Sequence, residues 1–594
     1  MKPIADYGLL GDTRTAALVS SDGSLDWLCV PRFDGDPIFG RLVGGPAAGR
    51  FRVGPATAGT VVERKYRHHT ATLETTWITP NGKLTLTEAM VAEVAGRLLP
   101  ATILVRRLSA EDGAVEALAE FDPRRGEEHS RPRSRRRGQD LVCEWGALAM
   151  SLSCDAVPAI EPDRSTSFMV TPERPVTFVL TVAHREPLIQ VDVAAGWALL
   201  ADDEGRWRDW TAQVDQELPF REEVVRSLLT LRLLTYSPSG APVAAPTTSL
   251  PEECGGVRNW DYRFAWPRDA SIGIAAFLGV GMVDEARGFL WWLLHASRLQ
   301  RPRLPVLLTL DGRQAPPERG LRDWPGYAGS VPVRVGNDAA QQHQLDGYGW
   351  ILNAGWTLVQ AGHPLYSETW RAMRGFADLV ARRWSEPDAG IWEVRGDQVH
   401  HVHSKLMAWL ALDSALRIAE THRLSDRRRR GWQAVREAIG IEVKKLGFDT
   451  SIGSYTRSYG SPELDAALLI LPRIGLEESG SPRVRGTVDA IRSRLGAGGP
   501  LLYRYPPGRD GLAGGEGAFL PCSFWLVDAL ALDGRGREAV DLFTELMDRA
   551  SPLGLYAEEM DPDTGAHLGN YPQALTHAAL IQAALSLRDL PPVS

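Results

Sequence analysis

Residues 404–421 read SKLMAWLALDSALRIAET, and this stretch would be apolar on nearly every side of a helix. Its large apolar side chains are Leu406, Met407, Trp409, Leu410, Leu412 and Leu416. Because a helix that is apolar all round must be surrounded by protein, the stretch predicts a buried helix. Residues 535–549 are instead apolar on one face, at Ala539, Leu542, Phe543 and Leu546. The chain therefore predicts two kinds of helix, one enclosed and one half-exposed.

Helical periodicity continues through the whole second part of the chain. It predicts helices over residues 222–236, 269–281, 283–299, 338–361, 366–384, 404–421, 428–446, 462–473, 482–494, 518–532, 535–549 and 573–587. This number of enclosed and half-exposed helices fits an inner ring wrapped by an outer ring. We therefore predict an (α/α)6 barrel over residues 216–594. We expect its two long loops, residues 300–337 and 495–517, to build a site at one end.

Before residue 220 the pattern changes to alternation with period 2, as in residues 61–66, 84–91, 102–108 and 176–182. Turn residues separate these segments, and Pro80-Asn81-Gly82 predicts a hairpin. Regularly spaced short strands predict an antiparallel β-sandwich over residues 1–215. At its end, residues 194–216 carry tryptophans at helical spacing and predict a linker helix.

Composition limits the partners of the chain. Its formal net charge of −8 argues against nucleic acid as the main partner. Residues 124–137 are rich in arginine but fit a solvated loop better than a nucleic-acid patch.

No apolar stretch reaches about 18 residues, so no membrane span is expected. The first residues lack the pattern of a signal peptide, and the five cysteines show no CxxC pair. We expect a cytoplasmic protein with reduced cysteines; the sequence does not indicate its oligomeric state.

Two segments carry carboxylates that could perform acid–base chemistry. Hydrolysis of a glycosidic bond with inversion needs one carboxylic acid to protonate the leaving oxygen and one carboxylate to activate water. Glu393 follows Trp392 in a turn-rich segment, where desolvation could keep it protonated, although it could instead be a loop glutamate paired with Arg395. Glu558 and Glu559 are adjacent, so one could face a cavity while the other is paired. A surface acidic turn is the alternative there.

Residues 258–269, RNWDYRFAWPRD, are dense in aromatic and charged side chains and precede a predicted helix. Asp269 could simply cap that helix. However, Arg268 and Asp269 beside Tyr262 and Trp266 could also grip sugar hydroxyls, because charged hydrogen bonds to hydroxyls give strict selectivity.

Together these segments resemble glycoside hydrolase family 15, the family of glucoamylases, glucodextranases and trehalases. Residues 4–12 (IADYGLLGD) and 22–29 (DGSLDWLC) resemble the N-terminal β-domain of its bacterial members. The remaining motifs follow in the order of the family: residues 258–269, GSVPVRVGN at 329–337, GIWE at 390–393, PCSFWL at 521–526 and LGNYPQA at 568–574. The resemblance covers essentially the whole chain.

The resemblance implies a β-sandwich, an (α/α)6 catalytic barrel and inversion at the anomeric carbon. It also implies that Glu393 is the general acid and Glu558 the general base. We expect Glu393 to be kept protonated by apolar neighbours and Glu558 to stay ionised. The residues expected to hold the sugar are Tyr262, Trp266, Arg268, Asp269, Trp392 and Glu559.

Three positions depart from the pattern of the family. Relatives often have Glu where this chain has Trp350, Tyr where it has His403, and Glu where it has Ala566. We expect all three near the sugar pocket, which puts the identity of the substrate in doubt. His400, His401 and His403 lack convincing partners for a metal, so neither a metal nor a cofactor is expected.

Our leading hypothesis is an inverting, exo-acting hydrolase of α-glucosidic bonds, of the glucoamylase or trehalase type, with a carbohydrate substrate. The competing hypothesis is a non-hydrolytic or specialised member that binds or acts on an unusual glycoside.

Overall fold

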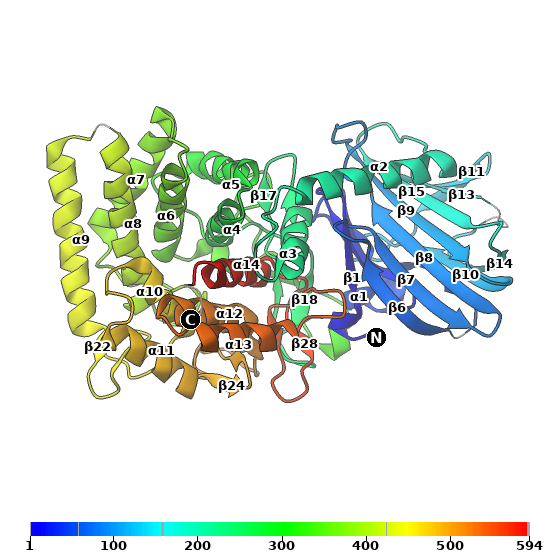
Figure 1. The fold of residues 1–594 in the computed structure, drawn as a ribbon. Coiled ribbons are helices and arrows are strands. Elements are labelled where there is room, and N and C mark those ends of the chain that lie inside the picture. Colours follow the sequence, from blue (N-terminus) through cyan, green and yellow to red (C-terminus); the bar gives the residue numbers. More distant parts are fainter. Residues whose placement is uncertain (1, 58, 156–159, 423, 591–594) are drawn as a thin grey trace.

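A computed structural model describes residues 2–57, 59–155, 160–422 and 424–590. A β-domain at one end of the molecule joins a helical domain at the other (Figure 1). The last strand of the β-domain ends at His184, and α2 (Val193–Thr211) leads to α3 (Arg221–Leu233), where the helical domain begins. The predicted fold class, a β-sandwich followed by a helical barrel, is confirmed.

Two antiparallel sheets form the N-terminal domain. One has the strand order β1-β2-β3-β5-β10-β14 with β4 on β3, and the other β11-β12-β13-β15-β9-β8-β7-β6. Phe51 and Phe178 pack between the sheets with their ring centroids 6.0 Å apart. The predicted hairpin joins β7 to β8 and pairs Thr79 with Gly82. The strands are β1 Gly8–Gly11, β2 Ala16–Val19, β3 Ser24–Val30, β4 Asp36–Phe39, β5 Arg50–Pro55, β6 Thr60–Tyr66, β7 Leu73–Thr79, β8 Gly82–Met90, β9 Ala101–Ala110, β10 Val115–Asp122, β11 Arg133–Arg137, β12 Asp140–Trp145, β13 Leu148–Cys154, β14 Ser165–Val170 and β15 Val176–His184.

The arginine-rich segment departs from the prediction. Part of residues 124–137, expected to be a loop, forms β11, an edge strand whose five residues are all exposed. Charged side chains on an edge strand discourage pairing with another chain, which explains why arginines suit this position.

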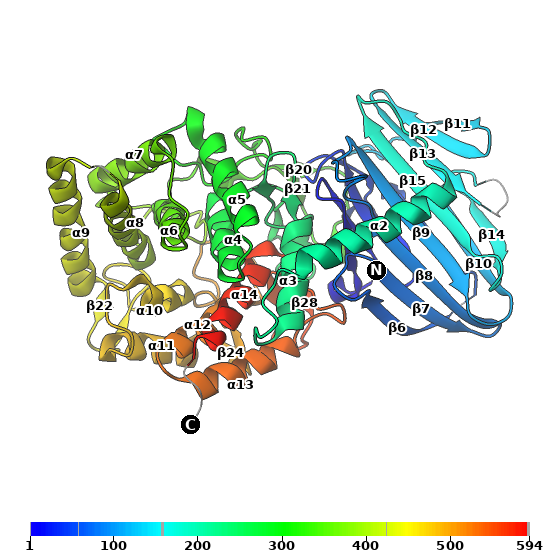
Figure 2. The same ribbon diagram turned by 45° about the horizontal axis from the view of Figure 1, so that its top comes forward.

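Helix α2 lies along the outer face of the larger sheet, over β9 and β15 (Figure 2). Leu200 of α2 is buried in a small apolar cluster with Val105 of β9 and Val179 of β15. Helix α2 therefore covers this face of the sheet before the chain enters the barrel, as the predicted linker helix would.

The helical domain is a double ring. Within the described residues its inner ring contains α4 (Pro267–Gly279), α6 (Asp346–Gln360), α8 (Val402–Thr421), the short pair η6 (Ala466–Ile470) and α10 (Leu471–Ile474), α12 (Leu520–Leu532) and α14 (Ala574–Arg588). Its outer ring contains α3, α5 (Val283–Ala296), α7 (Ser367–Arg383), α9 (Asp426–Leu446), α11 (Pro482–Arg494) and α13 (Gly536–Met547).

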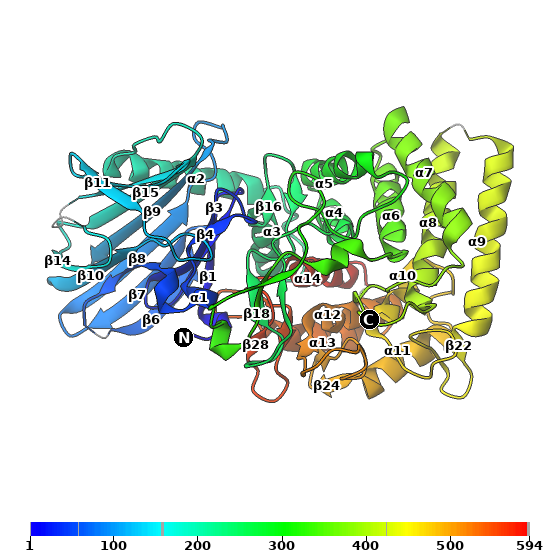
Figure 3. The ribbon, with the colours of Figure 1, turned by 180° about the vertical axis from the view of Figure 1, so that it is seen from behind.

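Helices of the inner ring are more completely buried than helices of the outer ring, as the sequence predicts. In α8, 16 of the 20 residues are buried. In α13 only the four apolar positions at helical spacing are buried. Figure 3 shows α14 crossing the middle of the domain, while α9 lies at its outer edge. The described part of the chain contains no helix long and apolar enough to cross a membrane.

Two predicted helices are shorter than expected. Residues 338–361 form a 3-10 turn, η5 (Asp338–Gln341), and then α6, because the chain turns between them. There the carboxylate of Asp388 accepts the backbone N–H of Leu345 at 2.9 Å. Residues 462–473 form η6 and α10, and Pro472, which cannot donate a helical hydrogen bond, lies in the first turn of α10.

Candidate functional site

A cavity of about 290 Å³ lies at the end of the barrel where the inner helices begin. The segment before α4, the loop before α8 and the second long loop all contribute to its wall. Its lining is mostly polar and consists of Glu252, Trp260, Tyr262, Asn337, Asp338, Ala339, Gln342, Trp392, Glu393, Arg395, Arg504, Tyr505, Asp510 and Leu512. Such a lining suits a ligand rich in hydroxyl groups.

One wall of the cavity carries Glu393. Arg268, in the first turn of α4, donates from Nη1 to the carboxylate of Glu393 at 3.1 Å and to the backbone oxygen of Ile391 at 2.7 Å. The indole N–H of Trp266 donates to the same carboxylate oxygen at 3.3 Å. Glu393 has a φ of 51°, in the left-handed region that is unusual for residues other than glycine. The start of α4 therefore holds the loop of Glu393 in a strained conformation, as is frequent at functional sites.

The other wall of the site carries Glu558, which is not part of the cavity lining; it is only 2% exposed and lies behind the lining residue Tyr262. The hydroxyl of Tyr262 donates to its Oε1 at 2.7 Å. Its Oε2 is buried and has no hydrogen-bond partner among the described residues. Gly569 lies against this carboxylate with a φ of 72°, and a Cβ at that position would come within 2.7 Å of Oε2. Glycine is therefore required beside Glu558.

A pair of aromatic rings connects the two walls. Tyr262 contacts Glu558, Trp266 contacts Glu393, and their rings meet edge-on with centroids 5.5 Å apart. The structure thus brings together both glutamates and the aromatic residues predicted to lie beside them. Asp269 is connected to Glu393 only through Arg268, because its carboxylate accepts a hydrogen bond from Nε of Arg268 at 2.7 Å.

Trp392 lines the cavity but is turned away from Glu393. Its indole N–H donates to Asp465 at 2.9 Å, and its ring packs edge-on against Phe519 at 5.1 Å. Arg395 pairs with Glu318 at 2.5 Å rather than with Glu393. Glu393 is therefore not the loop glutamate paired with Arg395 that the sequence left open.

The electrostatic setting of the two glutamates differs from the expectation. The carboxylate of Glu393 contacts the Arg268 guanidinium instead of apolar groups. Burial raises the pKa of Glu558 well above its ordinary value, and repulsion from Glu252 and Glu393 adds to this, against the opposing effects of Arg504 and Tyr262. Glu558 was expected to stay ionised, but an enclosed carboxylate among other carboxylates binds protons more readily.

Like Glu558, Glu559 is not among the residues that line the cavity, and its predicted contact with sugar stays a prediction. Its side chain is fully buried and accepts the backbone N–H of Gly517 at 2.7 Å. Its other oxygen lies 3.5 Å from Arg504. Since neighbouring residues of an extended segment point to opposite sides, Glu558 contacts Tyr262, whereas Glu559 contacts Gly517 and Arg504.

Beside Glu559 lies a buried ionic cluster that the sequence did not predict, and two of its members, Glu252 and Arg504, line the cavity. Arg504 lies 2.7 Å from Glu516 and 3.2 Å from Glu252, and Arg258 lies 2.9 Å from Glu516. Glu252, Glu516 and Glu559 are close enough to hold a cation, but the two guanidiniums already neutralise them. These residues come from distant segments, so no local pattern joins them; Arg258 belongs to the segment 258–269, but its neighbours in the sequence do not indicate a role for it.

The three departures from the family pattern lie outside the lining of the cavity. Trp350 and His403 line a separate small cavity deeper in the barrel, with ring centroids 6.5 Å apart. Ala566 is exposed in the turn between β27 (Glu559–Met560) and β28 (His567–Leu568). None of the three contacts the cavity directly: Trp350 and His403 are buried in the barrel interior, and Ala566 is exposed to solvent.

The fold resembles that of a known glycosidase. The crystal structure of a bacterial glucoamylase complexed with acarbose superposes with a TM-score of 0.72 and covers 99% of this chain and 95% of that one. The two sequences are only 14% identical, so the likeness shows the fold alone.

Sequence relatives are closer. A trehalase of Mycolicibacterium smegmatis is 36% identical over 98% of this chain and 91% of the relative. A trehalase of Thermoplasma volcanium is 32% identical over 98% of this chain and 93% of the relative. Residues 1–173 match the model of the trehalase-like N-terminal domain. Residues 219–585, more than half of the chain, match the model of glycosyl hydrolases family 15. The chain belongs to this family and is a glycoside hydrolase of the trehalase and glucoamylase type.

Proposed function

We propose that this enzyme hydrolyses the α-glucosidic bond of α,α-trehalose with inversion, using Glu393 as general acid and Glu558 as general base. The observation that carries the proposal is that two carboxylates, Glu393 in the cavity lining and Glu558 behind it, are connected through Tyr262 and Trp266. Inverting hydrolysis requires such a pair, with room for water on the side of the base.

Each carboxylate suits one half of the reaction. Glu393 has a quarter of its side chain exposed and can reach the glycosidic oxygen of a bound sugar. The acid gives its proton to that oxygen as the bond from the anomeric carbon breaks. Glu558 keeps one buried oxygen without a partner, which can accept a proton from water attacking the opposite face. The products are two glucose molecules, and the proton taken by Glu558 returns through solvent to Glu393.

Tyr262 and Arg268 act on these groups rather than on the bond. The hydrogen bond from Tyr262 fixes one oxygen of Glu558 and leaves the other for water. Arg268 anchors the loop of Glu393 through the backbone of Ile391. Trp392, held by Asp465, offers a fixed aromatic wall for a sugar ring.

Two observations favour trehalose over a long glucan. The relatives that match along the whole chain are named trehalases, and the N-terminal domain matches the trehalase-like model. The cavity of about 290 Å³ is at the lower end of the range for small-ligand sites, about 300–1,000 Å³, which favours a short saccharide. A specialised, non-hydrolytic role was suggested by the unusual residues Trp350, His403 and Ala566. None of them lines the cavity, so they do not favour that role.

The test is glucose release from trehalose, maltose, isomaltose, starch and dextran, each at several concentrations. We expect the highest kcat/KM on trehalose, and no release by Glu558→Gln beyond a few per cent of the parent. Faster turnover of maltose or starch would replace trehalose by an α-glucan as substrate. Tight sugar binding without glucose release from any of the five would contradict hydrolysis itself.

A further inference from the structure

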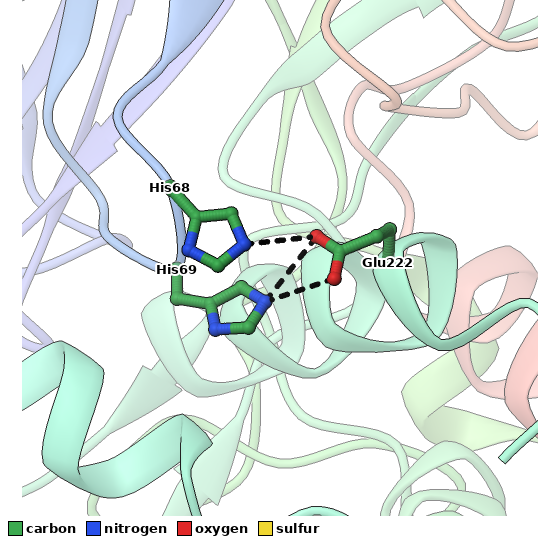
Figure 4. A group of neighbouring side chains, drawn as sticks. All are labelled: His68, His69 and Glu222. Carbon is green, nitrogen blue, oxygen red and sulfur yellow. Dashed lines mark hydrogen bonds and ion pairs between the residues drawn. The ribbon is translucent and has the colours of Figure 1, made fainter. Parts of the chain in front are cut away.

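Three side chains with metal-binding atoms converge far from the cavity, where the two domains meet (Figure 4). His68 and His69 lie in the turn between β6 and β7, and Glu222 lies in the first turn of α3. Nε2 of His69 is 3.2 Å from both carboxylate oxygens of Glu222, and Nε2 of His68 is 3.6 Å from one of them. The candidate ligand atoms all lie within 4.8 Å of one another.

The backbone makes this convergence possible. Consecutive side chains in extended chain point to opposite sides, so two neighbouring histidines do not normally share a ligand. His69 instead has a φ of 57°, which turns both imidazoles to the same side. The rings stack with centroids 3.7 Å apart. A left-handed conformation at a histidine is strained and persists only where the surroundings enforce it.

Helix α3 supplies those surroundings. Arg226, one turn after Glu222, donates to the backbone oxygen of Thr70 at 3.0 Å. Its guanidinium also lies 3.8 Å from the centroid of the Tyr66 ring. The histidine turn is therefore fixed at both sides to the helix that carries Glu222, and the three side chains do not depend on a loose loop for their positions.

We propose that His68, His69 and Glu222 bind a divalent transition-metal ion of the zinc type that links the β-domain to the barrel. Two imidazoles and one carboxylate are donors that such ions prefer, and water can complete four-fold coordination. Ligands about 2.0–2.1 Å from a tetrahedral zinc lie roughly 3.4 Å apart. The nitrogen–oxygen separations of 3.2 and 3.6 Å match that spacing.

Arg221 is the competing cation at this place. Its Nη1 lies 3.2 Å from Nε2 of His69 and 3.4 Å from Glu222. A metal ion on these ligands would meet the positive guanidinium, so Arg221 must turn away when the ion binds. Arg221 therefore weakens the site, and its removal should tighten metal binding. The site does not contact the glutamates of the cavity, so hydrolysis is not expected to require the ion.

The test uses the full chain freed of metal with a chelator, and cobalt(II) as the probe, because its visible absorption reports tetrahedral coordination. We expect one cobalt ion per chain, displaced by zinc, and a rise in the thermal midpoint when zinc is added. His68→Ala and Glu222→Gln should each weaken binding at least about tenfold, since loss of even an outer-sphere partner costs about 10–100-fold. The matched control is His363→Ala, which changes a histidine outside the proposed site. It should bind cobalt as tightly as the parent does.

Arg221→Met gives the sharpest outcome. It keeps the length of the side chain and removes the competing charge, so it should tighten cobalt binding at least about fivefold, because a unit charge at about 4 Å is worth about that much even in water. The proposal is overturned if the parent shows no tetrahedral cobalt spectrum, or if His68→Ala binds as tightly as the parent. Unchanged affinity in Arg221→Met would overturn it too.

Discussion

The two walls of the candidate site hold the same chemical group in different surroundings: Glu393 lines the cavity on the open wall, and Glu558 lies behind Tyr262 on the closed wall. Glu393 is partly open to solvent, sits on a strained loop and contacts a guanidinium and an indole N–H. Glu558 is enclosed, takes a single phenol hydrogen bond and keeps one oxygen without a partner. Glu393, on the open wall, can stay in contact with the leaving sugar as it departs. Glu558, on the closed wall, can hold one water in a fixed place. The contrast supports a division of labour that the residue types alone do not reveal.

The contrast also changes the expected pH behaviour. A base must be ionised to accept a proton, and burial raises the pKa of Glu558. Activity should therefore fall as the pH decreases through a value above that of an ordinary glutamic acid. A raised pKa also makes Glu558 a stronger base once it is ionised.

The largest effect is expected at the closed wall. Glu558→Gln keeps the shape of the side chain and its contact with Tyr262 but removes the proton acceptor. We expect kcat to fall by about two to four orders of magnitude, the usual worth of general acid–base catalysis, while KM changes little. Steady-state kinetics on trehalose measure both. A variant that keeps a tenth of the parent activity would remove Glu558 from the role of base.

The open wall should respond in a way that depends on the leaving group. Glu393→Gln should lose about two to three orders of magnitude in kcat on trehalose, because a sugar leaving group needs a proton. On α-glucosyl fluoride, whose leaving group needs little protonation, the loss should be far smaller. Glu558→Gln should be poor on both substrates. If Glu558→Gln is the variant rescued by the fluoride, the roles of the two walls are reversed.

A smaller effect is expected where Tyr262 supports the closed wall. Tyr262→Phe keeps the ring beside Trp266 but removes the hydrogen bond that favours the ionised carboxylate of Glu558. The pKa of Glu558 should rise further, so the acid side of the profile of kcat/KM should move to higher pH. We expect a loss of roughly tenfold near neutral pH that shrinks in alkaline buffer, since a neutral hydrogen bond to a charged group is worth about 1.5–3 kcal/mol. A loss that is equal at every pH would indicate a purely steric role.

The smallest effect on the chemistry is expected at Glu559, the neighbour of the base. Glu559→Gln can still accept the N–H of Gly517 but leaves Arg504 with one carboxylate fewer. We expect kcat to fall much less than in Glu558→Gln, and the thermal midpoint to drop, because a buried ion pair that loses a partner is destabilised. Calorimetry and kinetics on the same preparations separate the two effects. An inactive Glu559→Gln that melts at the parent temperature would place the base one residue later.

Much of the architecture could be predicted because it depends on periodicity. The enclosed texture of α8 and the single apolar face of α13 follow from residue spacing, and so does the change from strands to helices. The break before α6 could not be predicted, because it depends on Asp388, which accepts a backbone N–H from 43 residues away.

The site was predictable only in part, for a similar reason. Motifs identify residues that are close in sequence, such as Trp266 and Arg268, but not which way a side chain points. Apart from the resemblance to the family, the sequence does not distinguish Glu558 from Glu559, whereas the packing of Gly569 and Arg504 does. Arg504 and Glu252 are 252 residues apart, so no local pattern could have joined them.

The most direct test of the two-wall account is proton NMR of the glucose anomers formed in the first turnovers on α,α-trehalose. Water attack on the face opposite the leaving group produces one β-glucose, while the leaving sugar departs as α-glucose. The account predicts equal amounts of the two anomers before mutarotation mixes them. Release of α-glucose alone would mean that configuration is retained, and would contradict direct attack by a water molecule held at Glu558.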